Sequence, residues 1–77
     1  MKVWECDCYT YGDKLREMRK EKGWTQAQLA RVSGCNGITI TNYENGYRLP
    51  RLDILIKLGK ALGVEEIRFS TARKWYM

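Results

Sequence analysis

The chain has 77 residues, which is enough for one small domain with a modest core. Its 30% charged and 44% hydrophobic residues exclude a disordered chain, and no apolar run has the length of a membrane span or the pattern of a signal peptide. The formal net charge of +5 favours a polyanionic partner. We therefore expect a globular cytoplasmic domain.

Residues 1–9 precede the first helical pattern and are expected to form a short strand or an arm. A Thr-x-x-Asp cap pattern then begins at Thr10, and apolar side chains follow at i, i+4 and i+7, the spacing of an inward-facing helical stripe. The stripe comprises Tyr11, Leu15 and Met18. This pattern predicts a helix over residues 11–22.

Two short helices separated by one glycine are predicted next. Thr25 and Gln28 fit a capping box, in which Ser or Thr is followed three residues later by Glu or Gln. The box predicts a helix that begins at Gln26. Gly34 ends this helix, because glycine tolerates the left-handed backbone of a helix end. Asn36 is a favourable N-cap for the second helix.

The second short helix is predicted against the local propensity. The run Ile38–Thr41 is β-branched and alternates apolar with polar residues, which favours a strand. The run is short, however, and cap and stop signals bracket it at helical distance, so we favour a helix. Ile40 and Tyr43 then form its inward side. In the first short helix, the inward side is formed by Leu29, Ala30 and Val32. Gly46 ends it.

After a loop at Pro50, a fourth helix is predicted over about residues 52–62, with four leucines on its buried side. These are Leu52, Leu55, Leu58 and Leu62. Gly59 lies in the middle of this helix and could let another helix approach closely. A last turn or helix over about residues 65–70 is expected to bury Ile67 and Phe69.

The capped pair of helices resembles the phage repressor and Cro type of helix-turn-helix, an XRE-like and lambda-repressor-like family, with Gln26 as the first position of the unit. The resemblance covers about residues 10–66. The matching residues are Leu15-Arg16-Glu17-Met18-Arg19, Leu29-Ala30, Gly34, Ile40, Glu44-Asn45-Gly46 and Leu52–Val64. The resemblance implies an all-α domain of five helices over residues 10–70, with an N-terminal arm at 1–9 and a C-terminal tail at 71–77.

The same resemblance implies a small transcriptional regulator, expected to be a repressor, that binds double-stranded DNA sequence-specifically. The helix over about residues 37–45 would enter the major groove. Members of the family bind near-palindromic operators as dimers, so the expected partners are operator DNA and a second copy, in a bacterial or phage cytoplasm. The expected DNA-binding residues are Gln26, Asn36, Gly37, Ile38, Thr39, Thr41, Asn42, Asn45 and Arg48.

These positions differ in what they can contribute. Gly37 and Ile38 offer no side-chain hydrogen bond, so Thr41 and Asn42 are expected to make most polar base contacts, while Ile38 could meet a thymine methyl. Asn36 either caps its helix or contacts a base. Contacts to the sugar-phosphate backbone are expected near Gln26, Thr39, Asn45 and Arg48. Arg19 and Glu44 match a structural pair that ties the first helix to the recognition helix.

Three cysteines leave one alternative open. Cys6 and Cys8 form a Cys-x-Cys pair and Cys35 lies in the turn, but the chain has no histidine, and a zinc site would need an acidic fourth ligand. Reduced thiols, no metal and no cofactor are expected. A thiol- or metal-responsive regulator on the same fold is the alternative.

A second alternative is a protein-interaction module that has lost DNA binding, suggested by the poor hydrogen-bonding capacity of Gly37 and Ile38. Catalysis is not expected, because the sequence has neither a histidine base nor a glycine-rich loop for nucleotide phosphates.

Overall fold

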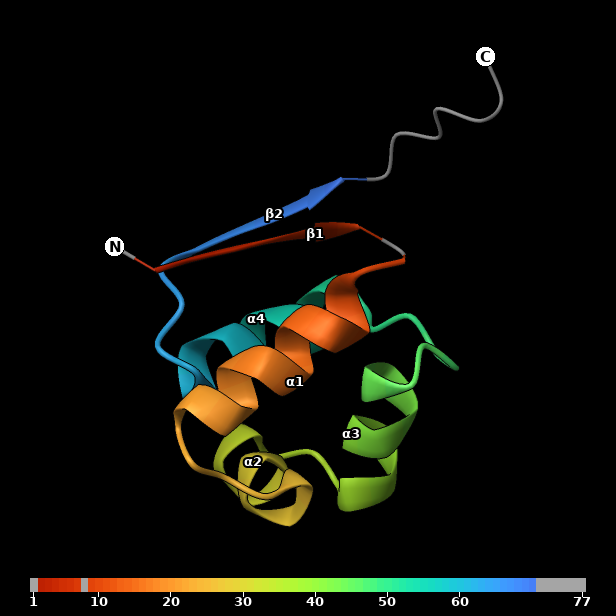
Figure 1. The fold of residues 1–77 in the computed structure, drawn as a ribbon, viewed down its shortest axis with the longest axis vertical. Coiled ribbons are helices and arrows are strands. Elements are labelled where there is room, and N and C mark those ends of the chain that lie inside the picture. The colour runs from red at the N-terminus through yellow and green to blue at the C-terminus, as the bar shows by residue number, and fades with distance from the viewer. Residues whose placement is uncertain (1, 8, 71–77) are drawn as a thin grey trace.

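A computed structural model of the chain describes residues 2–7 and 9–70. Its elements, in order, are β1 (Val3–Asp7), α1 (Tyr11–Glu21), α2 (Gln26–Ser33), α3 (Gly37–Glu44), α4 (Leu52–Ala61) and β2 (Glu66–Ser70). The two strands lie across α1 and α4, and α2 and α3 lie on the other side of these helices (Figure 1). No helix among these residues is long and apolar enough to cross a bilayer.

The four helices predicted over residues 11–62 are confirmed, but the fifth helix is wrong. Glu66–Ser70 is a strand, paired in parallel with Val3–Asp7 so that Trp4 lies opposite Ile67. The described residues therefore form four helices and a two-stranded sheet instead of an all-α, five-helix domain. The expected C-terminal tail at 71–77 lies outside the described residues.

In both strands, the side chains that face the helical core alternate along the chain with side chains that face away from it. In β1, Trp4 and Cys6 are buried while Glu5 is exposed, because successive side chains point to opposite faces of a strand. In β2, Ile67 and Phe69 pack against the core. Residues 3–7 are thus a strand of the core, which was one of the two forms expected for the segment 1–9.

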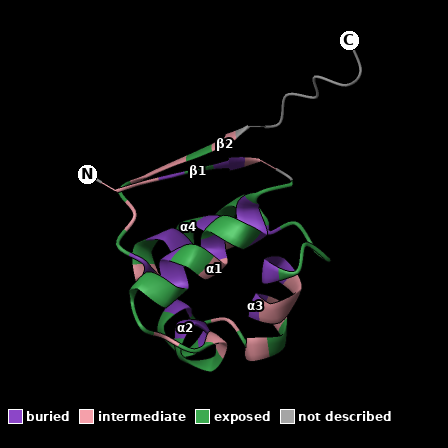
Figure 2. Cartoon of the chain, viewed as in Figure 1, coloured by how far each residue is buried: buried purple, intermediate pink, exposed green. Residues whose placement is uncertain are grey.

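One hydrophobic core joins all six elements (Figure 2). Trp4 of β1 is 1% exposed and lies among side chains from the helices. The largest fully buried side chains are Trp4, Leu15, Leu29, Ile40, Leu58 and Leu62. The predicted inward positions of α1 and α3 are confirmed, since Tyr11, Leu15, Met18, Ile40 and Tyr43 are all buried.

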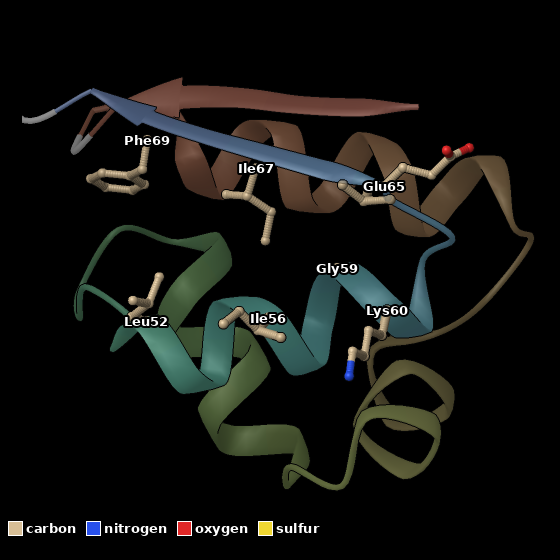
Figure 3. A pocket seen from close by; sticks show the side chains of 8 residues that line it. Leu52, Ile56, Gly59, Lys60, Glu65, Ile67 and Phe69 are labelled. Atoms are coloured by element: carbon tan, nitrogen blue, oxygen red, sulfur yellow. The ribbon is translucent and has the colours of Figure 1, made fainter. Parts of the chain in front are cut away.

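Some expected local features are wrong. Leu52 and Val32 were assigned to buried sides but are 69% and 54% exposed. Leu52 is the first residue of α4 and lines an open groove with Ile56 and Phe69 (Figure 3). Thr10 makes no side-chain cap hydrogen bond to α1; its hydroxyl accepts a hydrogen bond from the Asp7 N–H at 3.1 Å instead.

Two glycines mark close approaches between elements. A Cβ on Gly59 would lie 3.0 Å from Ile67 Cδ1, so the neighbour that approaches α4 is strand β2, where a helix was expected. A Cβ on Gly12 of α1 would lie 2.6 Å from the Tyr43 carbonyl oxygen and 2.7 Å from that of Glu44. The end of α3 thus packs directly on the backbone of α1.

Gly12→Ala should destabilise the fold by about 1–3 kcal/mol, because the added methyl group meets backbone atoms that cannot move aside without shifting α3. Urea unfolding at neutral pH measures the effect. Gly37→Ala is the matched control, since Gly37 is also helical and a Cβ there meets nothing within 4 Å. Equal stability of the two variants would contradict the close approach of α1 and α3.

Candidate nucleic-acid interface

The local signals predicted for the helix-turn-helix are confirmed. Thr25 Oγ1 accepts a hydrogen bond from the Gln28 N–H at 3.1 Å, and Gln28 Oε1 accepts one from the Thr25 N–H at 2.7 Å. Gly34 ends α2 in the left-handed conformation, with φ of +78°. Asn36 Oδ1 accepts from the Thr39 N–H at 2.8 Å and so caps α3.

Helix α3 forms despite its β-branched run, because packing fixes its inner side. Ile40 is fully buried and Tyr43 is 8% exposed, whereas Ile38, on the opposite side, is 76% exposed. Asn42 follows Ile38 by one helical turn and lies on the same outward side. The outward side of residues 36–42 carries no acidic group.

The expected pair Arg19–Glu44 is present and buried. Arg19 Nε donates to Glu44 Oε2 at 2.6 Å, and Arg19 Nη2 donates to Glu44 Oε1 at 3.1 Å. The Glu44 side chain is 0% exposed and that of Arg19 is 11% exposed. Arg19 Nη1 also donates to the Trp24 carbonyl oxygen at 2.7 Å. The pair therefore joins α1, the turn before α2, and the end of α3.

Gln26 and Thr41, two expected DNA contacts, are linked to this pair. Gln26 Nε2 donates to Glu44 Oε1 at 3.1 Å. The Thr41 hydroxyl lies within hydrogen-bond distance of two acceptors, Gln26 Oε1 at 2.8 Å and the Gly37 carbonyl oxygen at 2.9 Å. Both side chains thus make contacts inside the protein and hold α2 against α3.

Arg16 completes the network and was missed as a site residue. Its Nε donates to Glu44 Oε1 at 3.3 Å, and its Nη2 lies 3.3 Å from both the Glu44 carbonyl oxygen and Asn45 Oδ1. A signal was available in the sequence, because Arg16 precedes Arg19 by three residues and so lies on the same side of α1.

The network keeps Glu44 ionised. Burial alone raises the pKa of its carboxyl group, but hydrogen bonds from Arg19 and Gln26, the charge of Arg19 and a further hydrogen bond from Arg16 outweigh burial. The net effect is a pKa below the ordinary value of 4.5. Glu44 therefore remains a fixed negative centre at physiological pH.

A polar hollow lies beside α3. Asn36, Thr39, Arg48 and Arg51 line it together with Asp53. Arg48 and Arg51 are exposed, and Arg51 Nε lies 3.4 Å from Asp53 Oδ1. Arg51 was not identified from the sequence, where nothing separated it from other surface cations. Hydroxyl, amide and guanidinium groups in one hollow can hydrogen-bond a phosphate.

The environment of Cys6 does not favour a thiol or metal switch. Cys6 is buried, and burial, followed by the charge of Asp7, raises the pKa of its thiol to about 11. A thiol with such a pKa is a poor nucleophile and metal ligand at neutral pH. No group of three potential ligands occurs among residues 2–7 and 9–70. Cys8 lies outside the described residues.

Comparison with known proteins gives one family. The family described as Helix-turn-helix matches residues 15–69. The HTH-type transcriptional regulator AnsR of Bacillus subtilis (strain 168) is 41% identical over 46 residues, which are 60% of this chain and 40% of AnsR. The chain thus spans about two fifths of that relative's length.

Two solved structures share the fold. The restriction-modification controller protein C.AhdI from Aeromonas hydrophila has a TM-score of 0.72 at 36% identity, over 75% of this chain and 84% of C.AhdI. The P22 c2 repressor, solved in complex with a synthetic operator, has a TM-score of 0.67 at 30% identity, over 70% of this chain and 82% of the repressor.

Glu44→Gln should cost about 3–5 kcal/mol of stability, because it leaves the Arg19 guanidinium buried without a counter-charge. Urea unfolding at neutral pH measures the loss. Glu21→Gln is the control: Glu21 Oε1 lies 3.1 Å from Lys2 Nζ in an exposed pair, whose removal should cost less than about 1 kcal/mol.

The pH dependence of the same variant tests the ion pair separately. Because folding lowers the pKa of Glu44, its contribution to stability is present above the ordinary value of 4.5 and is lost as pH falls through the lower, folded value. The stability difference between the native protein and Glu44→Gln should therefore shrink on acidification. A constant difference down to about pH 3 would contradict an ionised Glu44.

Proposed function

The chain belongs to the XRE-type helix-turn-helix family of transcriptional regulators, and we propose that it binds double-stranded DNA sequence-specifically, as a repressor, with α3 in the major groove. One observation carries this proposal: the network around Glu44 fixes the inner side of α3, so that Ile38 and Asn42 face outward. An exposed helix side that is rigidly held and free of acidic groups suits the major groove.

Direct reading of bases is assigned to the outward side of α3. The Asn42 amide can form a bidentate contact with adenine, and Ile38 can pack on a thymine methyl group. Gly37 lets the helix backbone approach the DNA. The Asn36 Oδ1 atom caps the helix, which leaves its amide nitrogen for a base or phosphate.

The remaining site residues are assigned to positioning. Thr39 and Arg48 share the polar hollow, where a phosphate would also meet Arg51. Gln26 lies at the N-terminus of α2, where backbone N–H groups are available to an anion while its side chain holds Glu44. The Asn45 amide nitrogen can donate a hydrogen bond to a phosphate, because its oxygen already accepts one from Arg16. The Thr41 hydroxyl can accept a hydrogen bond from a base amino group.

Selection of bound duplexes from a random pool, at a salt concentration of about 150 mM, tests the function as a whole. We expect a consensus with two-fold symmetry, because two copies would bind half-sites about one helical turn apart, and repression would follow when such a site overlaps a promoter. The P22 c2 repressor, which resembles this chain, was solved on operator DNA. Recovery of no consensus would contradict sequence-specific binding.

Asn42→Ala should reduce the preference for the selected sequence over random DNA by about 1–3 kcal/mol, since one base-specific contact is lost. Competition binding with both duplexes measures this preference. An equal loss of affinity for cognate and random DNA would show that Asn42 contacts only the sugar-phosphate backbone.

Arg48→Ala should weaken binding to all duplexes alike and lower the slope of log K against log salt by about one, because one phosphate contact is removed. Lys2→Ala is the control, since Lys2 directly precedes β1 in the chain, and β1 lies across α1 from α3 (Figure 1). An unchanged slope for Arg48→Ala would exclude a phosphate contact there.

A further inference from the structure

A chain of hydrogen bonds leads from the buried Glu44 carboxylate to the Thr41 hydroxyl. Glu44 is ionised at neutral pH, and a carboxylate can only accept hydrogen bonds. The atom of Gln26 that lies 3.1 Å from Glu44 Oε1 must therefore be the amide nitrogen, Nε2. This orientation turns the Gln26 oxygen, Oε1, toward the Thr41 hydroxyl at 2.8 Å. The charge at the end of α3 thus fixes which atom of a side chain on α2 faces Thr41.

The proton of the Thr41 hydroxyl is used inside the protein. A hydroxyl group has one hydrogen to donate and two lone pairs that accept. Its two hydrogen bonds lead to Gln26 Oε1 and to the Gly37 carbonyl oxygen at 2.9 Å, and both of these atoms are acceptors. With its proton directed inward, Thr41 Oγ1 can only accept a hydrogen bond from a further partner.

Thr41 lies at the border between the buried and the outward sides of α3. It follows the exposed Ile38 by three residues and precedes the buried Glu44 by three, so these side chains form one row along the helix. Thr41 itself is half-buried. Its hydroxyl is therefore the point at which the network around Glu44 reaches the side of α3 that is assigned to the major groove.

We propose that this network makes Thr41 selective for an amino group, so that it accepts a hydrogen bond from adenine N6 or cytosine N4 in the major groove. Every base pair presents one such amino group there, whereas the keto oxygens of thymine and guanine are acceptors. Thr41 therefore distinguishes the two orientations of a base pair and selects the amino base on the strand that it faces. The inference rests on the proposed function and adds the class of base that one position selects.

Keto bases are disfavoured because they would cost a hydrogen bond inside the protein. To donate to thymine O4 or guanine O6, the Thr41 proton must leave Gln26 Oε1. If the proton stays, two acceptor oxygens face each other without a hydrogen between them. One neutral hydrogen bond corresponds to about a two- to tenfold change in affinity. Gln26 is thus a positioning residue that acts on the base through Thr41.

Thr41→Val tests the contact, because valine replaces the hydroxyl with a methyl group of similar size. Selection from a random pool with the native protein should give adenine or cytosine at one position of each half-site, and Thr41→Val should not select that position. In competition between duplexes that carry the two orientations of this base pair, the native protein should prefer the amino base by about fivefold, and Thr41→Val should show no preference. The conservative variant Thr41→Ser keeps the hydroxyl and should restore the preference.

A base analogue isolates the amino group. Replacing the selected adenine with purine removes the 6-amino group, and replacing a selected cytosine with 2-pyrimidinone removes the 4-amino group. The native protein should bind the substituted duplex about fivefold more weakly than the unsubstituted one, whereas Thr41→Val should lose no more than the weaker base pair itself costs. An equal loss for both proteins would overturn the contact.

Gln26→Met tests the role of the amide, because methionine is similar in length but offers no strong acceptor for the Thr41 proton. The hydroxyl can then turn and donate to a keto oxygen. The ratio of affinities for the amino and keto duplexes should therefore fall toward one, whatever happens to the affinity for all duplexes alike. Circular dichroism checks that the fold is retained. An unchanged ratio in Gln26→Met would overturn the role of Gln26.

A measurement without DNA separates this inference from the proposed function. In NMR spectra of the free protein, the Gln26 side-chain NH₂ protons should show nuclear Overhauser contacts to the Glu44 side chain; contacts to Thr41 alone would overturn the orientation. A protein with the expected contacts that selects no consensus refutes the proposed DNA binding, and the base preference fails with it. A consensus that carries thymine or guanine where Thr41 acts refutes only this inference.

Discussion

A single buried carboxylate determines how the helices of this protein meet. Glu44 is at the last position of α3, where a negative charge is unfavourable for the helix dipole, and its side chain has no contact with water. It is stable there only because cations from α1 and an amide from α2 surround it. Because these groups must surround the Glu44 carboxylate, α1, α2 and α3 meet at one point, and the rotation of α3 about its own axis is fixed.

The rotation of α3 decides which side chains DNA can meet, and the same network limits what they can do there. Gln26 and Thr41 could form hydrogen bonds to DNA, but in this structure they bind each other, and Gln26 also binds Glu44. On the outward side, Ile38 is an exposed aliphatic side chain and Asn42 is a half-buried amide. A helix with so few polar groups should gain much of its specificity from apolar contacts and from DNA shape.

The extent to which the sequence predicts this structure depends on how local each feature is. The caps at Thr25 and Asn36 and the left-handed Gly34 involve neighbouring residues only, and they are confirmed. A last turn or helix was expected over about residues 65–70, because a short apolar run is ambiguous by itself. The strand that pairs with residues 66–70, Val3–Asp7, is at the other end of the chain. The internal contacts of Gln26 and Thr41 could not be predicted for the same reason, since they depend on side-chain positions across two helices. The assignment of individual residues to DNA remains a prediction.

The strand in place of a helix changes the surface as well as the fold. Strand β2 leaves Leu52 and Ile56 of α4 partly exposed, and at Gly59 the missing side chain lets Ile67 approach. A two-stranded parallel sheet is weak by itself and leaves two open edges. Trp4, buried against the helices, anchors β1, and Ile67 and Phe69 pack β2 against the same core. Strand β2 also borders the exposed aliphatic side chains of α4, so the groove and one edge of the small sheet lie together.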